Sequence, residues 1–407
     1  MNKEKKLFWR FQGNENKYVN QIFKKGFKFK TAPYSEKLEK KWSSFHKLKY
    51  SICINSCTSA LHIAFRSLGI KEGDEVIVPA LTPIMCGTTV HFCNATPVYA
   101  DVNYENFLIS INDVKKKITS KTKAILAVHM YSGICDLREL KKICREKKIY
   151  LVEDCAEAVG AKDKNGNLAG TVGDISCWSF QSAKQLTSGD GGILSTNNKV
   201  LGKRIRQFSN LGFKTLTAKS NQIIISKDKR QNPNYSRFTE IGFNYRMNEF
   251  SAAIALAQLE RIKLFIKLRR MAGNAFEKLL AGNKYLVPQR INKKEYSTYY
   301  TFAANLKIKN KKKLNWEKFR KKFMKYGGDG IYAASKLLHQ EPAVRKYKIG
   351  KCYKSCKKNC VINCYGTPVA KKLQKNLLLF TTNQSNNIEI YKQIKALKKT
   401  LTYFQIK

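Results

Sequence analysis

From residue 50 onward, short apolar runs rich in β-branched residues alternate with segments of helical periodicity. The apolar runs are YSICINS, DEVIVPA, TPVYADV, KAILAVHMY, IYLVEDC, ISCWSF and GGILST. Between them, TSALHIAFRSLG and DLRELKKICREKKI repeat apolar residues at the spacing of one helical face. This alternation predicts an α/β fold with a mainly parallel sheet, covered by helices on both faces, that carries ligand groups at its strand ends.

The chain is expected to divide into three parts. Residues 1–49 form an N-terminal segment, residues 50–263 a large domain built on the sheet, and residues 264–407 a smaller α+β domain. A long helix within MNEFSAAIALAQLERIKLFIKLRRMAGNAFEKLL leads into the last part. The polar segment 214–240 interrupts the pattern and is a candidate lid. With 407 residues and 43% hydrophobic content, the chain can bury a large core.

The formal charge of +48 favours anionic partners, because a strong positive field attracts phosphate backbones. However, only 15 of the 77 basic residues are Arg, the residue suited to base readout and bidentate phosphate binding. The lysines are also spread along the whole chain. We therefore expect solvated lysine-rich faces and no specific nucleic-acid site.

The sequence shows no apolar run of about 18 residues and no secretory signal at its amino terminus, so we expect no membrane span and a cytoplasmic protein. Eight of the twelve cysteines are scattered singly through the chain, several in apolar segments. They are expected to be small buried hydrophobes in a reducing compartment.

One lysine has unusual surroundings. In SFQSAKQLTSGDGG, Lys184 is flanked by small and polar residues and precedes a glycine-rich turn, unlike the lysines of the solvated charge runs. Most lone lysines face solvent, but one in such a setting is a candidate chemical group.

Three motifs at strand ends would meet in a parallel sheet: CTSA, EDCAEA and SFQSAK. Thr58 and Ser59 open a helix, whose N-terminus favours an anion, and Ser179 adds a hydroxyl for a phosphate. Asp154 follows the apolar run IYLV and could keep a pyridine nitrogen protonated, while Lys184 could form a Schiff base. Taken singly, each motif has an ordinary reading as a helix cap, an ion pair or a surface lysine.

Together these motifs resemble the pyridoxal-phosphate-dependent sugar aminotransferases of the DegT/StrS type, which have the aspartate aminotransferase fold (PLP fold type I). The resemblance covers about residues 50–265. It lies in CTSALHIAFRSLGIKEGDEVIVPALT, TKAILAVHMYSGICDL, LVEDCAEAVGA, GDISCWSFQSAKQLTSGDGG and IGFNYRMNEFSAA. It implies pyridoxal 5'-phosphate (PLP) as cofactor, bound by the large domain of residues 50–263.

The resemblance also implies a role for each site residue. Lys184 would form the Schiff base, Asp154 would pair with the pyridine nitrogen, and Glu157 would lie near the phenolic oxygen. The phosphate would be held by Thr58, Ser59 and Ser179, and by Asn244 from the neighbouring subunit of a homodimer. Lys184 also argues against the branch of the family that has histidine there and dehydrates sugars.

The sequence departs from the family pattern at several positions. Pro83 stands where an aromatic residue usually stacks over the pyridine ring, and Cys57 stands where glycine is common. The carboxyl-terminal third matches only loosely, through YAASKLLHQEPAV and GTPVA. We therefore expect weaker stacking and an adjusted phosphate turn.

The expected reaction is amino transfer from glutamate or glutamine to a keto-sugar, expected to be nucleotide-linked, for a polysaccharide or glycoconjugate. Lys184 would also move the proton, a task suited to a lysine with a depressed pKa. Gln181 resembles cyclitol aminotransferases, so a keto-cyclitol acceptor is one alternative. A basic PLP-binding regulator or nucleic-acid-binding protein is another.

Four cysteines, Cys352, Cys356, Cys360 and Cys364, recur at four-residue intervals. Four thiolates could bind zinc, but on one straight helix the outer pair would be roughly 18 Å apart, too far for one metal. No His accompanies them. We therefore expect reduced thiols on a surface segment, or small buried hydrophobes, and no metal site.

Overall fold

The structure, a computed structural model, describes residues 9–25, 33–307, 314–346 and 366–406. The four cysteines between positions 352 and 364 lie outside these ranges. Within them, no helix combines the length and the apolar composition needed to cross a bilayer.

A seven-stranded sheet forms the centre of the molecule, in the order β1-β7-β6-β5-β4-β2-β3. All seven predicted runs are strands: β1 (Tyr50–Ile54), β2 (Glu75–Pro79), β3 (Thr96–Ala100), β4 (Thr122–Val128), β5 (Tyr150–Asp154), β6 (Ile175–Ser179) and β7 (Gly192–Thr196). Neighbouring strands pair in parallel except at β7, which is antiparallel to both β1 and β6. The carboxyl ends of β1, β5 and β6 therefore meet at one edge, as the sequence predicts.

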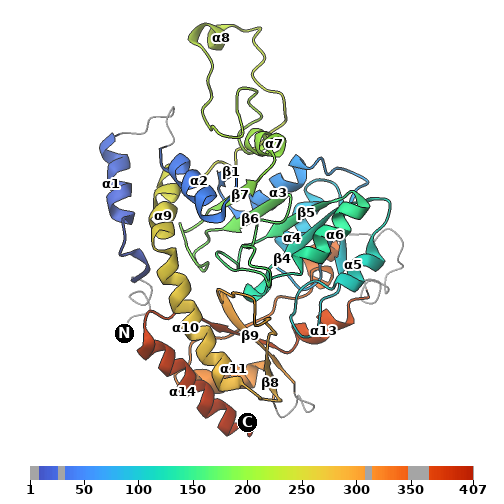
Figure 1. The fold of residues 1–407 in the computed structure, drawn as a ribbon, viewed down its shortest axis with the longest axis vertical. Helices are drawn as coiled ribbons and strands as arrows, with labels where there is room; N and C mark the ends of the chain where they lie inside the picture. The colour runs from blue at the N-terminus through green and yellow to red at the C-terminus, as the bar shows by residue number, and fades with distance from the viewer. Residues whose placement is uncertain (1–8, 26–32, 308–313, 347–365, 407) are drawn as a thin grey trace.

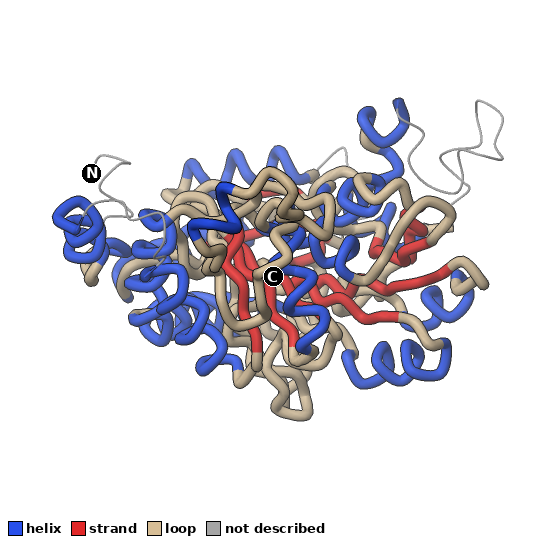
Figure 2. Tube along the Cα trace, turned by 90° about the horizontal axis from the view of Figure 1, so that it is seen from above, coloured by secondary structure: helices blue, strands red, loops and turns tan. Residues whose placement is uncertain are grey.

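The central strands, such as β2 and β6, are buried along their whole length because helices lie on both faces of the sheet (Figure 2). The helices of this part are α3 (Cys57–Ser67), α4 (Met85–His91), α5 (Ile111–Lys117), α6 (Leu137–Lys147) and α7 (Lys199–Ser209). For example, α3 packs on β6 and β7, and α6 packs on β4 and β5. The result is the mainly parallel, helix-covered sheet of the expected α/β class.

Two N-terminal helices, α1 (Glu15–Lys25) and α2 (Pro33–His46), pack against α9 (Glu249–Glu260) (Figure 1). The long helix expected after residue 247 is two helices, because the chain leaves helical geometry at Arg261 before α10 (Ile262–Leu280) begins. Side chains in the first half of α10 join the core of the large sheet, whereas Phe276 and Leu280 join a second core.

The second core lies against an antiparallel sheet in the order β10-β11-β9-β8. Its strands are β8 (Leu286–Pro288), β9 (Thr301–Leu306), β10 (Tyr332–Ala333) and β11 (Leu377–Thr381). The helices of this part are α11 (Trp316–Lys325), α12 (Pro342–Lys346), α13 (Pro368–Gln374) and α14 (Asn387–Tyr403). This arrangement matches the smaller α+β part expected from the sequence, although the boundary at residue 264 remains a prediction.

The polar segment 214–240 extends away from the body of the molecule, with the short helix α8 (Lys227–Gln231) at its tip (Figure 1). Its exposed residues do not line either of the two cavities at the strand ends described below. The segment is therefore not a lid over the site of its own chain in this conformation.

Candidate active site

A cavity of about 290 Å³ opens where β1, β5 and β6 end. Five of the predicted site residues line it: Thr58, Asp154, Glu157, Ser179 and Lys184. Ser59 and Asn244, the other two, are not among the lining residues. The strand ends thus bring together groups that are far apart in the sequence.

One end of the cavity is the N-terminus of α3. The hydroxyl of Ser56 caps the helix by accepting the N–H of Ser59 at 3.1 Å, and the two hydroxyl oxygens lie 2.9 Å apart. Thr58 and Ser56 face the cavity, whereas Ser59 is engaged with the cap. A side chain at Gly192 would lie 2.9 Å from the N atom of Cys57, so this glycine lets β7 approach the helix. Helix N–H groups and hydroxyls at one point suit a phosphate.

Asp154 lies at the other side of the cavity, at the end of β5. Its carboxylate accepts the N–H of Ala156 at 3.0 Å, and the thiols of Cys86 and Cys57 approach it at 3.4 and 4.0 Å. Burial raises the pKa of Asp154 above its ordinary value, so the site favours a positive partner for this carboxylate. A protonated pyridine nitrogen is such a partner.

Lys184 lies between these two ends, in the loop after β6. Its Nζ atom is 3.4 Å from Glu157 Oε1 and 4.3 Å from the centre of the Tyr300 ring. Glu157 is itself oriented by the N–H of Tyr131, at 2.8 Å. The amine therefore points into the cavity and not to solvent.

The expectation of a depressed pKa is wrong for the free amine of Lys184. Burial by itself lowers the pKa, but the negative charge of Glu157, together with Tyr300 and Asp154, raises it above the ordinary value. Lys184 and Glu157 were both predicted as site residues from the sequence, but the contact between their side chains was not.

Several lining residues are absent from the predicted set. Tyr300 comes from the second part of the chain, Met85 from the start of α4, and His129 and Met130 from the segment that follows β4. Pro83 does line the cavity at the position where the resemblance led us to expect an aromatic ring. Tyr300 could not be predicted as a site residue, because the region around it resembles the family only loosely.

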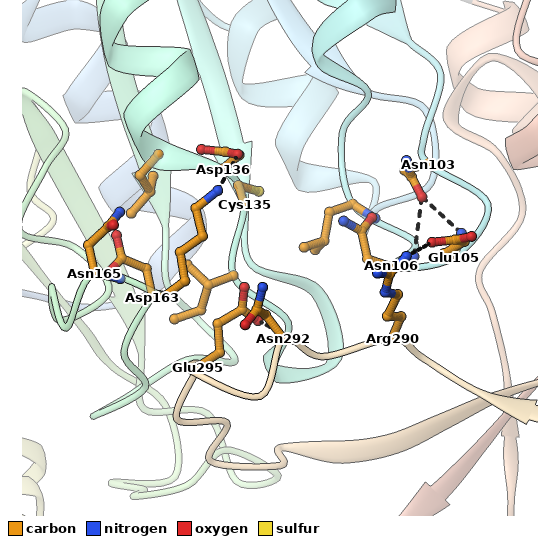
Figure 3. A pocket seen from close by; sticks show the side chains of 14 residues that line it. Asn103, Glu105, Asn106, Cys135, Asp136, Asp163, Asn165, Arg290, Asn292 and Glu295 are labelled. Carbon is orange, nitrogen blue, oxygen red and sulfur yellow. Dashed lines mark hydrogen bonds and ion pairs between the residues drawn. The ribbon is translucent and has the colours of Figure 1, made fainter.

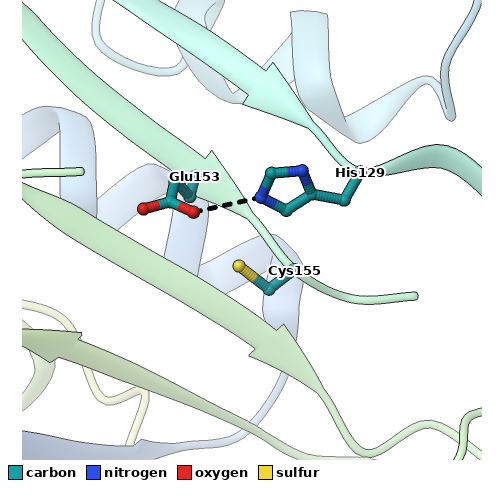
Figure 4. A group of neighbouring side chains, drawn as sticks. All are labelled: His129, Glu153 and Cys155. Carbon is teal, nitrogen blue, oxygen red and sulfur yellow. Dashed lines mark hydrogen bonds and ion pairs between the residues drawn. The ribbon is translucent and has the colours of Figure 1, made fainter. Parts of the chain in front are cut away.

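His129 belongs to a buried cluster with Glu153 and Cys155 (Figure 4). Its Nε2–H donates to Glu153 at 3.0 Å, while its Nδ1 accepts the N–H of Cys135 at 3.2 Å. The carboxylate also accepts the N–H groups of Gly170, Val172 and Gly173. Because these donors occupy the acceptor positions of the carboxylate, the cluster holds loops together and leaves it no lone pair for a metal.

A second cavity of about 470 Å³ adjoins the first and shares Pro83, Met130, Glu157 and Tyr300 with it. Residues of the small sheet, among them Tyr332, Leu379 and Thr381, line its far side. Its position beside Lys184 makes it the natural place for substrate.

A third, polar cavity of about 250 Å³ lies apart and shares no lining residue with the other two (Figure 3). Its charges are largely paired within the chain: Lys164 lies 3.0 Å from Asp136, and Arg290 pairs with Glu105. Asp163 accepts the N–H groups of its own turn. Because the charges of this cavity are largely paired, the candidate reactive group is Lys184 and not a residue of the third cavity.

The residues of the first cavity fit PLP. The helix N-terminus and Ser179 suit its phosphate, Asp154 suits its ring nitrogen, and Lys184 suits its aldehyde. Asn244 lies outside this set, exposed in a loop that pairs with Asn210.

Comparison with known proteins agrees with this geometry. The model of the DegT/DnrJ/EryC1/StrS aminotransferase family matches residues 10–371. The chain is 36% identical over 292 residues to a GDP-perosamine synthase of Vibrio cholerae, covering 71% of this chain and 73% of that relative. It is 31% identical over 271 residues to an L-glutamine:2-deoxy-scyllo-inosose aminotransferase of Streptomyces kanamyceticus, covering 66% and 61% of the two chains.

The fold has also been seen in solved structures. An aminotransferase from Psychrobacter cryohalolentis has a TM-score of 0.83 to this chain with 24% sequence identity, over 96% of this chain and 97% of the other. A streptococcal protein of the same fold has been solved in a PLP-form and a PMP-form.

Proposed function

Since the chain belongs to the DegT/DnrJ/EryC1/StrS aminotransferase family and uses PLP, we propose that it aminates a nucleotide-linked keto-sugar for polysaccharide or glycoconjugate synthesis. The amino donor is glutamate or glutamine. The observation that carries the proposal is the position of Lys184 Nζ, in a cavity with Asp154 on one side and the N-terminus of α3 on the other.

The relatives support a nucleotide sugar over a cyclitol. The GDP-perosamine synthase is 36% identical to the chain, whereas the cyclitol aminotransferase is 31% identical and a smaller share of its length is covered. Gln181, which resembles the cyclitol enzymes, lines the lysine cavity. A keto-cyclitol therefore remains the comparison substrate in any assay.

Each of the site residues has a separate role in the reaction. When bound, PLP supplies an electron sink, and Asp154 stabilises the positive charge on its ring nitrogen. Thr58, Ser179 and the N–H groups of α3 hold the phosphate. The Nζ atom of Lys184 would act as the base that moves the proton at the reacting carbon, and Glu157 and Tyr300 hold this atom in place.

A homodimer fits the exposed apolar residues near Asn244. Phe92, Phe238 and Ile241 are 54%, 52% and 85% exposed, more than an isolated chain would favour for side chains of this size. A partner placed on this face would bring its own Asn244 toward the phosphate end of the cavity. The eight described cysteines are free and buried, which supports a cytoplasmic protein.

The proposal is tested by loading the enzyme with PLP, converting it with L-glutamate, and then adding acceptors. A GDP-linked keto-sugar should restore the PLP absorbance, and a keto-inositol should do so far more slowly. Faster reaction with the keto-inositol would assign the cyclitol reaction instead. No response to either acceptor would overturn the proposed substrate class.

A further inference from the structure

Two buried arginines, Arg10 and Arg269, line the substrate-side cavity next to Lys184. Arg10 is 2% exposed and Arg269 is 5% exposed, although they come from the N-terminal segment and from α10. Fully buried arginines are normally paired with a carboxylate. Arg10 and Arg269 are therefore expected to have a negatively charged partner.

Both guanidinium groups bind backbone carbonyls of the Lys184 loop. Arg10 donates to the carbonyls of Ser182, Lys184 and Gln185 at 3.1, 2.6 and 3.3 Å. Arg269 donates to the carbonyls of Ala183 and Tyr300 at 3.4 and 2.7 Å and to the hydroxyl of Thr382 at 3.1 Å. These contacts position the loop, but carbonyl dipoles do not neutralise two full charges.

No carboxylate forms an ion pair with either arginine within the described part of the chain. The one carboxylate of the cavity wall, Glu157, pairs with Lys184. Burial lowers the pKa of Arg10 to about 10 and that of Arg269 to about 9, and the charge of Arg10 adds to the effect at Arg269. The two like charges thus face one cavity without a counterion.

We propose that Arg10 and Arg269 recognise a carboxylate of the amino donor in the cavity beside Lys184. This inference rests on the proposed amino transfer from glutamate or glutamine. A small planar carboxylate can enter a desolvated wall and supply the missing negative charge, whereas a diphosphate carries more hydration into it. The acceptor phosphate is the other possible source of an oxyanion at this place.

The test is the binding of glutarate, a five-carbon dicarboxylate without an amine, to the PLP-loaded enzyme. Its dissociation constant is measured from the change in cofactor absorbance or from the shift in melting temperature. We expect Arg10→Met and Arg269→Met each to weaken glutarate roughly tenfold to a hundredfold, the range for one charge-assisted contact. Arg269→Lys should retain part of the affinity.

Arg270→Met is the matched control. Arg270 is the next residue of α10 and also donates to a backbone carbonyl, that of Ser297 at 2.6 Å, but it does not line the cavity. Its loss should leave glutarate binding unchanged. Propylamine, which has no carboxylate, tests whether the lysine loop is still correctly positioned. The rate of its reaction with the cofactor should be unchanged in Arg10→Met and Arg269→Met.

The results of these measurements distinguish donor binding, acceptor binding and a purely structural role of the two arginines. Glutarate binding unchanged in both methionine variants would overturn the proposal, as would an equal loss for glutarate and propylamine, which indicates a purely structural role. Weaker binding of GDP with unchanged binding of glutarate would assign the arginines to the acceptor. Because glutarate binding needs no acceptor, failure to aminate keto-sugars would leave this result intact. If Arg269→Met does not fold, Arg10→Met and Arg269→Lys decide.

Discussion

The Sγ atom of Cys86 lies 3.4 Å from Oδ2 of Asp154. Burial raises the pKa of the Cys86 thiol well above its ordinary value, so the group remains an S–H donor directed at the carboxylate. Thr82 in turn donates to the same sulfur at 3.2 Å. Beside the backbone N–H of Ala156, only weak thiol donors approach Asp154, so the carboxylate can interact with a positive partner in the cavity.

Replacing Asp154 by Asn should preserve PLP binding and reduce amino transfer roughly a hundredfold or more, because the amide cannot stabilise a positive ring nitrogen. Absorbance of bound cofactor measures the first effect and single-turnover rates with L-glutamate measure the second. Asp190→Asn, at another lining position, is the control. Near-normal turnover in Asp154→Asn would remove this residue from the mechanism.

Borohydride reduction should attach the cofactor to Lys184 and to no other of the many lysines. The reason is position, since Lys184 Nζ lies in the cavity beside Glu157. Peptide mapping by mass spectrometry identifies the labelled residue, and Lys184→Ala should lose both the label and amino transfer. A label on any other lysine would show that the site has been assigned wrongly.

Asn244 is predicted to complete the site of a partner subunit. The variants Lys184→Ala and Asn244→Ala should each be impaired, but a mixture unfolded and refolded together should regain activity. Mixed dimers then contain one site with both lesions and one intact site. Recovery should approach a quarter of wild-type activity, since about half of the dimers are mixed and each has one good site. A mixture no more active than its components would indicate that Asn244 acts within its own chain or not at all.

Glu153→Gln should destabilise the fold by about 1–3 kcal/mol, the cost of leaving buried hydrogen-bond donors without an acceptor. The new amide group would replace one carboxylate oxygen and would face either the N–H groups of Val172 and Gly173 or those of Gly170 and His129. Urea unfolding measures the loss. Glu146→Gln, at an exposed position, should change stability little. Equal stability of the two variants would mean that the His129–Glu153 cluster adds nothing to the fold.

The buried His46 predicts how stability depends on pH. Burial lowers its pKa from 6.5 to about 3, so between these values the unfolded chain binds a proton that the folded chain does not. Stability should therefore fall as the pH falls through this window, by about 1.4 kcal/mol per pH unit for one such residue. His46→Phe, which keeps the packing on Trp42 and Trp178, should reduce this slope.

His91→Phe, at a partly exposed position, serves as the control and should leave the slope as it is. Burial also lowers the pKa values of His62 and His339, each to about 4, so part of the slope should remain in His46→Phe. A slope identical to that of the wild type would contradict the lowered pKa of His46.

The strands and their shared edge could be predicted because buried parallel strands leave a strong local signal. Each run from YSICINS to GGILST is built around apolar residues, and the topology of a parallel sheet then brings Thr58, Asp154 and Lys184 together. The break at Arg261 was missed, since periodicity continues across one residue that leaves helical geometry.

The arginines beside the lysine loop could not be predicted. Arg10 and Lys184 are 174 residues apart, and no periodicity or motif connects them. The raised pKa of Lys184 was missed for a related reason, because it depends on the distance to Glu157 and on Tyr300, not on the residues next to it. Such long-range side-chain contacts are set by tertiary packing, which local patterns do not record.

The contacts of Arg10 and Arg269 also have a consequence for biosynthesis. During translation the segment with Lys184 leaves the ribosome long before Arg269, and Arg269 also donates to Thr382, near the end of the chain. Gln258 and Arg261 donate to the carbonyl of Arg10, so the N-terminal segment also cannot take its final position until α9 has been synthesised. Contacts between distant segments form late in folding. A nascent chain halted before α14 should therefore contain the large sheet but not a catalytically competent lysine loop.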